Sequence, residues 1–180
     1  VYAWIEVPGT VINYAVVQSA TDDLFYINHA VDKSYFSGGS IFSQRYNTTT
    51  FQDSMTVLYG HNSRSQAMFA QLNNFADASF FEQNQSIYIY TPEKVYEYQI
   101  FAAYPHSSDH LLLCNDFNDP DQFAAYFDSL ADGVNCNYRR DLFPQFGDKV
   151  LTLSTCYRQN RTQRFLVQGV LTQEYTVLKK

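Results

Sequence analysis

The sequence predicts one domain with a mainly β fold, and three observations support this. Of the 180 residues, 46% are hydrophobic and 17% are charged, which is typical of a folded globular chain. This length suits a single domain with its own core, and no internal repeat or linker divides it. Fifteen Tyr and fifteen Phe favour strands, because flat side chains pack well on a pleated sheet. We therefore expect a single domain over residues 1–180.

Four strands are predicted in the first third of the chain. Three of them cover residues 4–7, 11–17 and 55–59, and residues 38–42 are expected to form a tight turn that enters the other one. Pro8-Gly9-Thr10 supplies a turn between the first two, and Gly38-Gly39 a tight turn before the third. A short helical turn is expected over residues 22–27. The fourth strand ends at Gly60, which places His61 directly after a strand end.

Two helices and four further strands are predicted in the remainder. Apolar residues at helical spacing predict a short amphipathic helix over residues 65–75. An acidic start with a proline, followed by a second apolar stripe, predicts another helix over residues 119–130. The strands cover residues 86–90, 95–103, 149–153 and 164–171, and the first two form a hairpin around residues 91–94.

The charge and hydropathy patterns exclude two kinds of partner. The net charge is −6 with a pI near 5.0, and the basic residues are scattered, which argues against nucleic acid binding. No stretch approaches the ~20 apolar residues that cross a bilayer, and no signal-peptide pattern opens the chain. The chain begins at Val1 inside a strand-like run, so we expect an N-terminal leader or membrane anchor to be absent from this sequence.

Histidine spacing predicts neither a metal site nor a cofactor. His106 and His110 are the closest pair, but they bracket Ser-Ser-Asp in a predicted loop, where we expect solvated side chains. His29 lies in a polar turn region and is interpreted in the same way.

Cys114, Cys136 and Cys156 form no CxxC pair, and three thiols cannot all be paired within one chain. Cys114, within Leu-Leu-Leu-Cys, is expected to be a small apolar core residue, and Cys136 a loop thiol. Cys156 differs because it ends a predicted strand in a region rich in Arg, a setting that favours the nucleophilic thiolate.

Cys156, His61 and Arg164 together indicate thiol acyl transfer. A thiol, an imidazole and a guanidinium supply a nucleophile, a proton carrier and a fixed positive charge. Each residue has a simpler interpretation on its own: Cys156 as apolar filler, His61 as a structural histidine after a turn, and Arg164 as a surface charge. Their joint order and sequence contexts are more specific than any one of them.

The chain resembles the sortases over nearly its whole length, from Trp4 to about Val170. The matching stretches are Trp4-Ile, Ile12-Asn-Tyr14, Val17-Gln18, Gly39-Ser-Ile-Phe42, Tyr59-Gly-His-Asn62, Met68-Phe69 with Leu72, Thr152-Leu-Ser-Thr-Cys156 and Arg164-Phe-Leu-Val. It is most similar to class B, because the helix expected over residues 119–130 lies between the sixth and seventh barrel strands. The loop over residues 157–163 is basic where relatives often carry acidic residues, which leaves the preferred substrate residues open.

The resemblance implies an eight-stranded β-barrel with appended helices and a cysteine transpeptidase without a cofactor. Cys156 would attack the threonine carbonyl of an LPxTG-like or NPxTx-like sorting signal. His61 would carry protons, and Arg164 would hold the substrate backbone and the oxyanion. The acceptor would be an amine of peptidoglycan or a pilin lysine. The enzyme would work at the extracellular face of the cytoplasmic membrane of a Gram-positive cell, where only an N-terminal anchor would touch the membrane.

Four residues are candidates for substrate binding. Ser154 and Thr155 precede the nucleophile on its strand, and Ser154 should face the same side of the sheet as Cys156. The simpler interpretation of Ser154 is strand packing. Asp23 and Ile27 resemble the short helical segment that contacts the sorting signal in class B relatives.

Three other functions fit the sequence less well. A papain-like protease places its Cys before its His, whereas here His61 precedes Cys156 by 95 positions. A redox thiol protein would need a second Cys close to Cys156 to resolve a sulfenic acid. A non-catalytic, aromatic-rich binding barrel of the cell surface would have no need to align the three residues, and its function would survive replacement of Cys156 by Ala.

Overall fold

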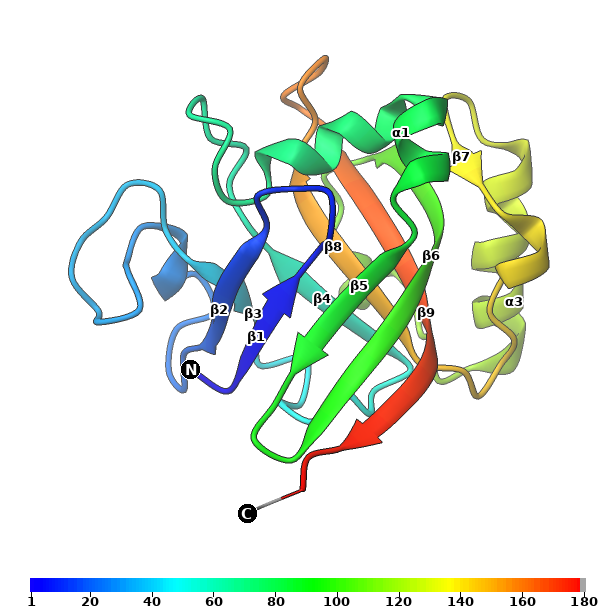
Figure 1. Cartoon of the computed structure of the whole chain (residues 1–180). Coiled ribbons are helices and arrows are strands. Elements are labelled where there is room, and N and C mark those ends of the chain that lie inside the picture. Colours follow the sequence, from blue (N-terminus) through cyan, green and yellow to red (C-terminus); the bar gives the residue numbers. More distant parts are fainter. Residues whose placement is uncertain (179–180) are drawn as a thin grey trace.

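A computed structural model describes residues 1–178, and its centre is a closed β-barrel (Figure 1). The strands are β1 (Ala3–Glu6), β2 (Asn13–Gln18), β3 (Ile41–Ser43), β4 (Met55–Tyr59), β5 (Ser86–Tyr90), β6 (Lys94–His106), β7 (Asn137–Tyr138), β8 (Val150–Cys156) and β9 (Arg164–Thr176). They run in the order β5-β1-β2-β3-β4-β8-β9-β6-β7, and β5 also pairs with β6. That pairing closes eight strands into a barrel and leaves β7 as a short extension along β6. The predicted mainly β, eight-stranded barrel is confirmed.

The long strands β6 and β9 form the most extensive pair of the sheet. They run antiparallel from Lys94↔Thr176 to His106↔Arg164, with register shifts at Glu97/Tyr98 and at Ile100/Ala102. Shifts of this kind bend a strand and increase its twist, so the two strands can curve around the core. The sheet also contains parallel pairs. One joins β4 to β8, and Tyr59↔Ser154 is the last residue pair along these two strands. The ends of β4, β8 and β9 therefore meet at one rim of the barrel.

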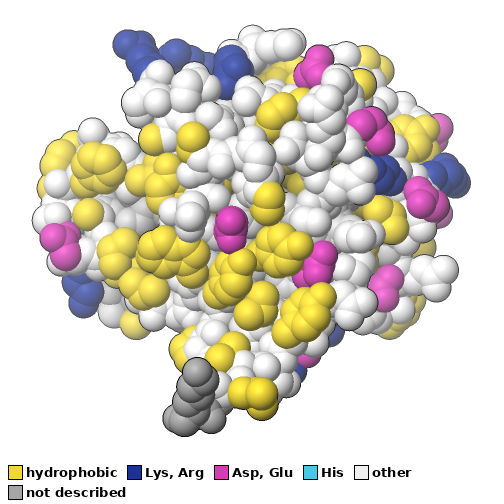
Figure 2. Space-filling model, viewed as in Figure 1, with side chains coloured by type: hydrophobic (Ala, Val, Ile, Leu, Met, Phe, Trp, Pro, Cys, Tyr) yellow, Lys and Arg dark blue, Asp and Glu magenta, His cyan; other side chains and the backbone are white. Residues whose placement is uncertain are grey.

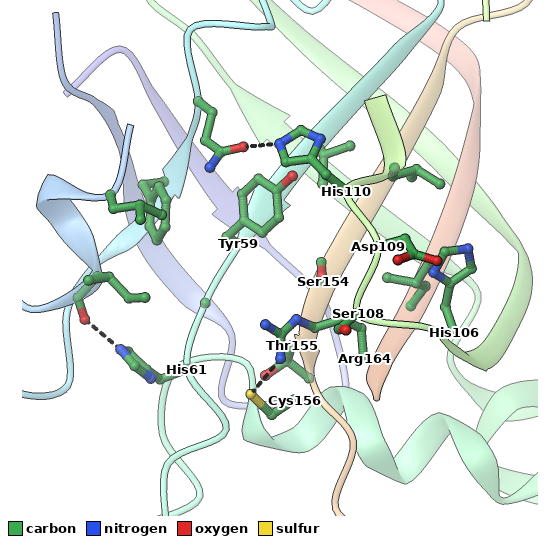
Figure 3. A pocket seen from close by; sticks show the side chains of 18 residues that line it. Tyr59, His61, His106, Ser108, Asp109, His110, Ser154, Thr155, Cys156 and Arg164 are labelled. Atoms are coloured by element: carbon green, nitrogen blue, oxygen red, sulfur yellow. Dashed lines mark hydrogen bonds between the residues drawn. The ribbon is translucent and has the colours of Figure 1, made fainter. Parts of the chain in front are cut away.

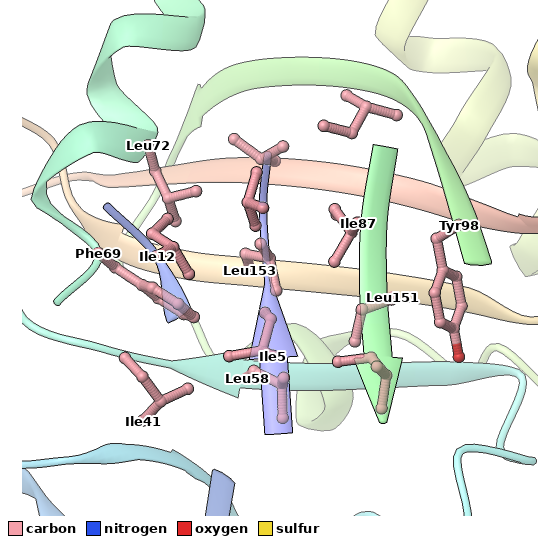
Figure 4. Close-up of a cluster of buried hydrophobic side chains, with 14 of the residues drawn as sticks. Ile5, Ile12, Ile41, Leu58, Phe69, Leu72, Ile87, Tyr98, Leu151 and Leu153 are labelled. Carbon is pink, nitrogen blue, oxygen red and sulfur yellow. The ribbon is translucent and has the colours of Figure 1, made fainter. Parts of the chain in front are cut away.

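The two larger of three hydrophobic clusters hold the fold together, one inside the barrel and one outside it. The inner cluster contains aliphatic residues from opposite strands, among them Ile5, Ile87 and Leu153, which have no exposed surface (Figure 4). The outer cluster lies between the sheet and α3 (Pro120–Asp128), where Phe123 and Phe127 are buried against the barrel. Because side chains pack on both the inner and the outer face of the sheet, these clusters account for the high aromatic content of the chain.

The predicted helix over residues 119–130 is confirmed. Asp119 caps α3 by accepting bonds from the backbone N–H groups of Asp121 and Gln122, and η3 (Ser129–Asp132) continues the chain. The helix lies between β6 and β8, which are the sixth and seventh strands of the barrel. The other short helices are η1 (Phe25–Ile27), α1 (Ala78–Gln83), α2 (Leu111–Cys114) and η4 (Arg140–Leu142).

The helix predicted over residues 65–75 was only partly right. The structure has a loop to Phe69 and then the 3-10 helix η2 (Ala70–Ala76). Gln66 and Met68 have positive φ angles of 61° and 55°, which a helix does not contain. The apolar spacing arises because Phe69, Leu72 and Phe75 are all buried in the inner hydrophobic cluster of the barrel. In residues 1–178, no helix is both long enough and apolar enough to span a membrane.

Candidate active site

A cavity of about 260 Å³ opens at the rim where β4, β8 and β9 end. Its walls are mainly apolar and come from η1, from strands β3, β4, β8 and β9, and from the segment after β6. The apolar lining residues are Leu24, Ile27, Phe42, Val57, Tyr59, Leu111 and Leu166. Cys156, His61 and Arg164 also line this cavity (Figure 3), so the fold brings the three predicted catalytic residues to one site.

Cys156 and Arg164 face each other across neighbouring strands. They are Cα partners in the antiparallel β8–β9 pair, and Arg164 Nη1 donates to Cys156 Sγ at 3.2 Å. Both side chains are half-buried. A guanidinium at this distance stabilises a thiolate, because hydrogen bonds to ionised acceptors are stronger than neutral ones. The register between β8 and β9 thus places the Arg164 guanidinium beside the Cys156 thiol.

His61 reaches the cavity through a turn at Gly60. A Cβ on Gly60 would lie 2.7 Å from the Phe69 ring, so the turn needs glycine. His61 Nε2 donates to the Ile27 carbonyl at 2.5 Å, which fixes a proton on that nitrogen because a carbonyl only accepts. In Figure 3 the His61 imidazole points along its dashed hydrogen bond, which is the bond to the Ile27 carbonyl, and away from Cys156. The two residues share the cavity without a hydrogen bond between them.

The four predicted substrate-binding residues fall in two places. Ser154, Thr155 and Ile27 line the cavity, and both hydroxyl residues are buried. The Thr155 hydroxyl has no hydrogen-bond partner within residues 1–178. Asp23 is absent from the lining: its carboxylate accepts three bonds from Arg45, one from the backbone N–H and two from the guanidinium. Arg45 also holds the pKa of Asp23 below its usual value.

His110 was expected to be solvated, and that prediction was wrong. It lines the cavity, its Nε2 lies 2.7 Å from Gln44 Oε1, and its Nδ1 is buried without a partner in the described part of the chain. Tyr46 covers its ring edge-on, with the centroids 5.0 Å apart. His106 is half-buried at the end of β6, where it pairs with Arg164. The loop between β6 and α2 is folded back over the cavity, and a spacing pattern does not reveal that.

Of the other two thiols, Cys114 departs from expectation, whereas Cys136 lies in a loop as predicted. Cys114 is exposed, because α2 is a single turn that buries only Leu111. Cys136 is half-buried beside the outer cluster, and burial raises its pKa to about 11. Neither has the cationic surroundings of Cys156, which leaves Cys156 as the thiol best placed for nucleophilic attack.

Two asparagines that the sequence analysis missed hold the backbone of the nucleophile. Asn62 Nδ2 donates to the Cys156 carbonyl at 3.0 Å, and Asn73 Nδ2 donates to the same oxygen at 3.2 Å. Asn62 lies next to His61 in the matching Tyr-Gly-His-Asn stretch, which was a signal that could have been used. Asn73 lies 83 positions from Cys156, and no local pattern marks it.

Tyr59 adds a neutral hydroxyl to the cavity wall. Burial raises its pKa to about 12, although the positive charge of Arg164 acts in the opposite direction. Tyr59 therefore remains a hydrogen-bond donor at neutral pH. No group of three His, Cys, Asp or Glu side chains in residues 1–178 is arranged to hold a metal ion.

Comparisons with known proteins point to one family. The family model described as Sortase domain matches residues 5–172. The chain is 29% identical over 170 residues to Sortase B of Listeria monocytogenes, an alignment that covers 93% of this chain and 68% of that protein.

Solved structures agree with this. Sortase B of Clostridium perfringens has a TM-score of 0.84 and 30% identity, with 96% of this chain and 93% of that chain covered. A Streptococcus pyogenes class B sortase involved in pilus biogenesis has a TM-score of 0.82 and 29% identity, with coverage of 96% and 92%. The fold is thus shared with class B sortases.

Proposed function

Because the chain belongs to the sortase family, we propose that it is a class B-like cysteine transpeptidase that cleaves a cell-wall sorting signal after threonine. The observation that carries this proposal is the 3.2 Å contact between Arg164 Nη1 and Cys156 Sγ inside a cavity that His61 also lines. A thiol, a cation and an imidazole at the end of a mainly apolar cavity suit acyl transfer from a peptide.

The first half of the reaction forms a thioacyl enzyme. The Cys156 thiolate attacks the threonine carbonyl carbon, and negative charge develops on the carbonyl oxygen. Arg164 offers its guanidinium N–H groups to that oxygen, a kind of stabilisation worth about 3–4 kcal/mol in well-studied sites. The C–N bond then breaks as His61, acting as the imidazolium, gives one proton to the departing amine and is left as the neutral imidazole.

The second half transfers the acyl group to an amine. The incoming amine attacks the thioester carbon, His61 takes the proton that the amine loses, and the C–S bond breaks to release the Cys156 thiolate. In the protein without substrate, His61 Nε2 donates to the Ile27 carbonyl. This hydrogen bond must open before the imidazole can reach the reacting amine. Ile27 lies in the wall that a bound peptide would contact, so substrate binding is the event we expect to release the ring.

The cavity wall supports a peptide with apolar residues before the threonine. Ser154 and Thr155 lie beside the nucleophile and line the cavity, and the Thr155 hydroxyl is buried without a hydrogen-bond partner in residues 1–178. Either an LPxTG-like or an NPxTx-like signal has a residue with which this apolar wall can pack. We retain Ile27 as a substrate contact. Asp23 stays a prediction: its bonds to Arg45 would let it support the wall from behind rather than touch the peptide.

We propose that the acceptor is an amine of peptidoglycan or a pilin lysine. The similarity to a class B sortase involved in pilus biogenesis supports the pilin lysine, and the peptidoglycan amine is the other acceptor that the resemblance to sortases implies. With such acceptors the enzyme would act in the envelope of a Gram-positive cell, on the outer side of the cytoplasmic membrane.

Fluorogenic pentapeptides of both types test this function. The protein and its Cys156→Ala variant are compared with and without triglycine as the acceptor amine, and Cys114→Ala is the matched control for loss of an exposed thiol. We expect cleavage that needs Cys156 and a second product that needs triglycine. No cleavage of any peptide by the unmodified protein, with Cys156 unreactive toward iodoacetamide, would favour the non-catalytic binding barrel.

A further inference from the structure

The carbonyl of Cys156 lies where the sheet has no strand to pair with it. On β8, the Ser154 carbonyl accepts a bond from Gly60 N at 3.1 Å, and Tyr59↔Ser154 is the last pair with β4. Carbonyls two residues apart point to the same side of a strand, so the Cys156 carbonyl points beyond the end of β4. A backbone acceptor in such a position needs donors from elsewhere.

Asn73 supplies one donor and also fixes the residue beyond the nucleophile. Its Nδ2 donates to the Cys156 carbonyl at 3.2 Å, and its Oδ1 accepts from the Arg158 backbone N–H at 2.7 Å. One buried amide, only 7% exposed, therefore spans the two backbone groups on either side of Tyr157. The Arg158 side chain adds a bond to the Ala70 carbonyl at 3.1 Å, so this basic residue of the loop anchors it to η2.

Asn62 links the same carbonyl to the proton carrier. Its Nδ2 lies 3.0 Å from the Cys156 carbonyl, and it is covalently next to His61. The His61 carbonyl in turn accepts from Phe69 N at 3.0 Å, at the start of η2. The backbones of both catalytic residues are thus tied to one 3-10 helix and to each other.

We propose that Asn73, assisted by Asn62, is a positioning residue that holds the Cys156 backbone so that its sulfur stays against Arg164. That Cys156 is the nucleophile rests on the proposed function. The hydrogen bonds that hold its backbone and place its sulfur beside Arg164 do not depend on that function. Asn73 touches neither the sulfur nor the cavity, and it acts through the backbone on both sides of Tyr157. When the Asn73 amide is removed, β8 loses one of the two donors that replace a neighbouring strand, and the end of the strand is held less tightly. A shift of about 1 Å at a catalytic group can cost about 100-fold in rate.

The test measures the alkylation rate of Cys156 by iodoacetamide at pH 7, followed by mass spectrometry of the peptide that contains it. Cys114 in the same molecule is the internal control, because it is an exposed thiol on α2. The variants are Asn73→Ala, Asn73→Asp and Asn62→Ala. Asn73→Asp keeps the acceptor for Arg158 N–H and removes the donor to the Cys156 carbonyl. Thermal melting checks the fold, and peptide cleavage gives kcat and KM.

We expect Asn73→Ala and Asn73→Asp to slow Cys156 alkylation by about tenfold or more, with the Cys114 rate unchanged. Asn62→Ala should act in the same direction with a smaller loss, and it leaves η2 intact if an Asn73 variant fails to fold. The loss in cleavage should appear in kcat, with KM within about twofold.

Unchanged Cys156 alkylation in all variants that fold would overturn the proposal. A parallel change at Cys114 would do the same, because it would indicate a general loss of structure. If the alkylation results hold while no peptide is cleaved by the unmodified protein, the positioning role stands and the proposed transpeptidase function fails.

Discussion

Replacing Arg164 by Ala separates two roles that one guanidinium can have. In the free protein it makes one contact with the nucleophile, from Nη1 to Cys156 Sγ at 3.2 Å, with both side chains half-buried. A hydrogen bond to a charged group contributes about 1.5–3 kcal/mol. At 1.36 kcal/mol for each factor of ten, the loss corresponds to a reaction of Cys156 with an electrophile that is slower by up to about 10- to 150-fold.

The oxyanion role adds a second loss that only peptide cleavage can report. Alkylation by iodoacetamide forms no oxyanion, so Arg164→Ala should slow it only by the factor for the thiolate. Cleavage of the sorting peptide should fall further, by roughly another 100- to 1,000-fold in kcat, because removing one oxyanion donor has that effect in other enzymes. The ratio of the two losses measures the oxyanion contribution.

Arg164→Lys is the matched control. It keeps the positive charge and loses the planar fork of donors, so thiolate reactivity should fall less than in the Ala variant while cleavage remains strongly impaired. Equal alkylation rates in the unmodified protein and Arg164→Ala would refute the thiolate role. Equal losses in alkylation and cleavage would refute the oxyanion role.

Three further predictions concern stability and thiol chemistry. Gln168→Ala removes a fully buried amide that donates to the Thr152 hydroxyl at 2.9 Å. We expect the free energy of unfolding in urea to fall by about 2–5 kcal/mol. A fall below about 1 kcal/mol would contradict a stabilising role for this buried hydrogen bond. Cys136, whose pKa burial raises to about 11, should have about 0.1% thiolate at pH 8, so it should be alkylated far more slowly than exposed Cys114 and should gain reactivity as the pH rises toward 11. Asp119→Ala removes the cap of α3 and should cost about 1 kcal/mol, whereas Asp119→Asn should cost little, as measured by thermal melting.

The barrel could be predicted because its signals are local. Short β-rich runs between turns gave eight segments that correspond to the barrel strands, and the proline with an acidic cap located α3. The failure over residues 65–75 has a physical cause. Phe69, Leu72 and Phe75 share a core-facing side in a 3-10 helix with a preceding loop, and that spacing also fits an α-helix.

The three candidate catalytic residues, which line one cavity, could be picked out from the sequence, whereas the contacts that support them could not. Cys156, His61 and Arg164 stand at strand ends, where position along the chain indicates position in space. The bond from His61 to the Ile27 carbonyl, the buried Nδ1 of His110 and the contact of Asn73 depend on segments far apart in sequence. The surface was also outside the reach of the sequence. Figure 2, viewed as in Figure 1, shows exposed hydrophobic side chains gathered between single acidic side chains. The alternation of residues along a strand does not indicate which exposed side chains from different strands lie together.

The most direct test of the central claim is intact-mass measurement of the protein after it is mixed with a sorting-signal peptide. The proposed mechanism predicts an adduct equal in mass to the acyl half of the peptide, located on Cys156 and lost when triglycine is added. Cys156→Ala should show neither the adduct nor cleavage. Peptide cleavage that persists in Cys156→Ala, or that proceeds in the unmodified protein with the acyl group found on another residue, would contradict a thioacyl transpeptidase.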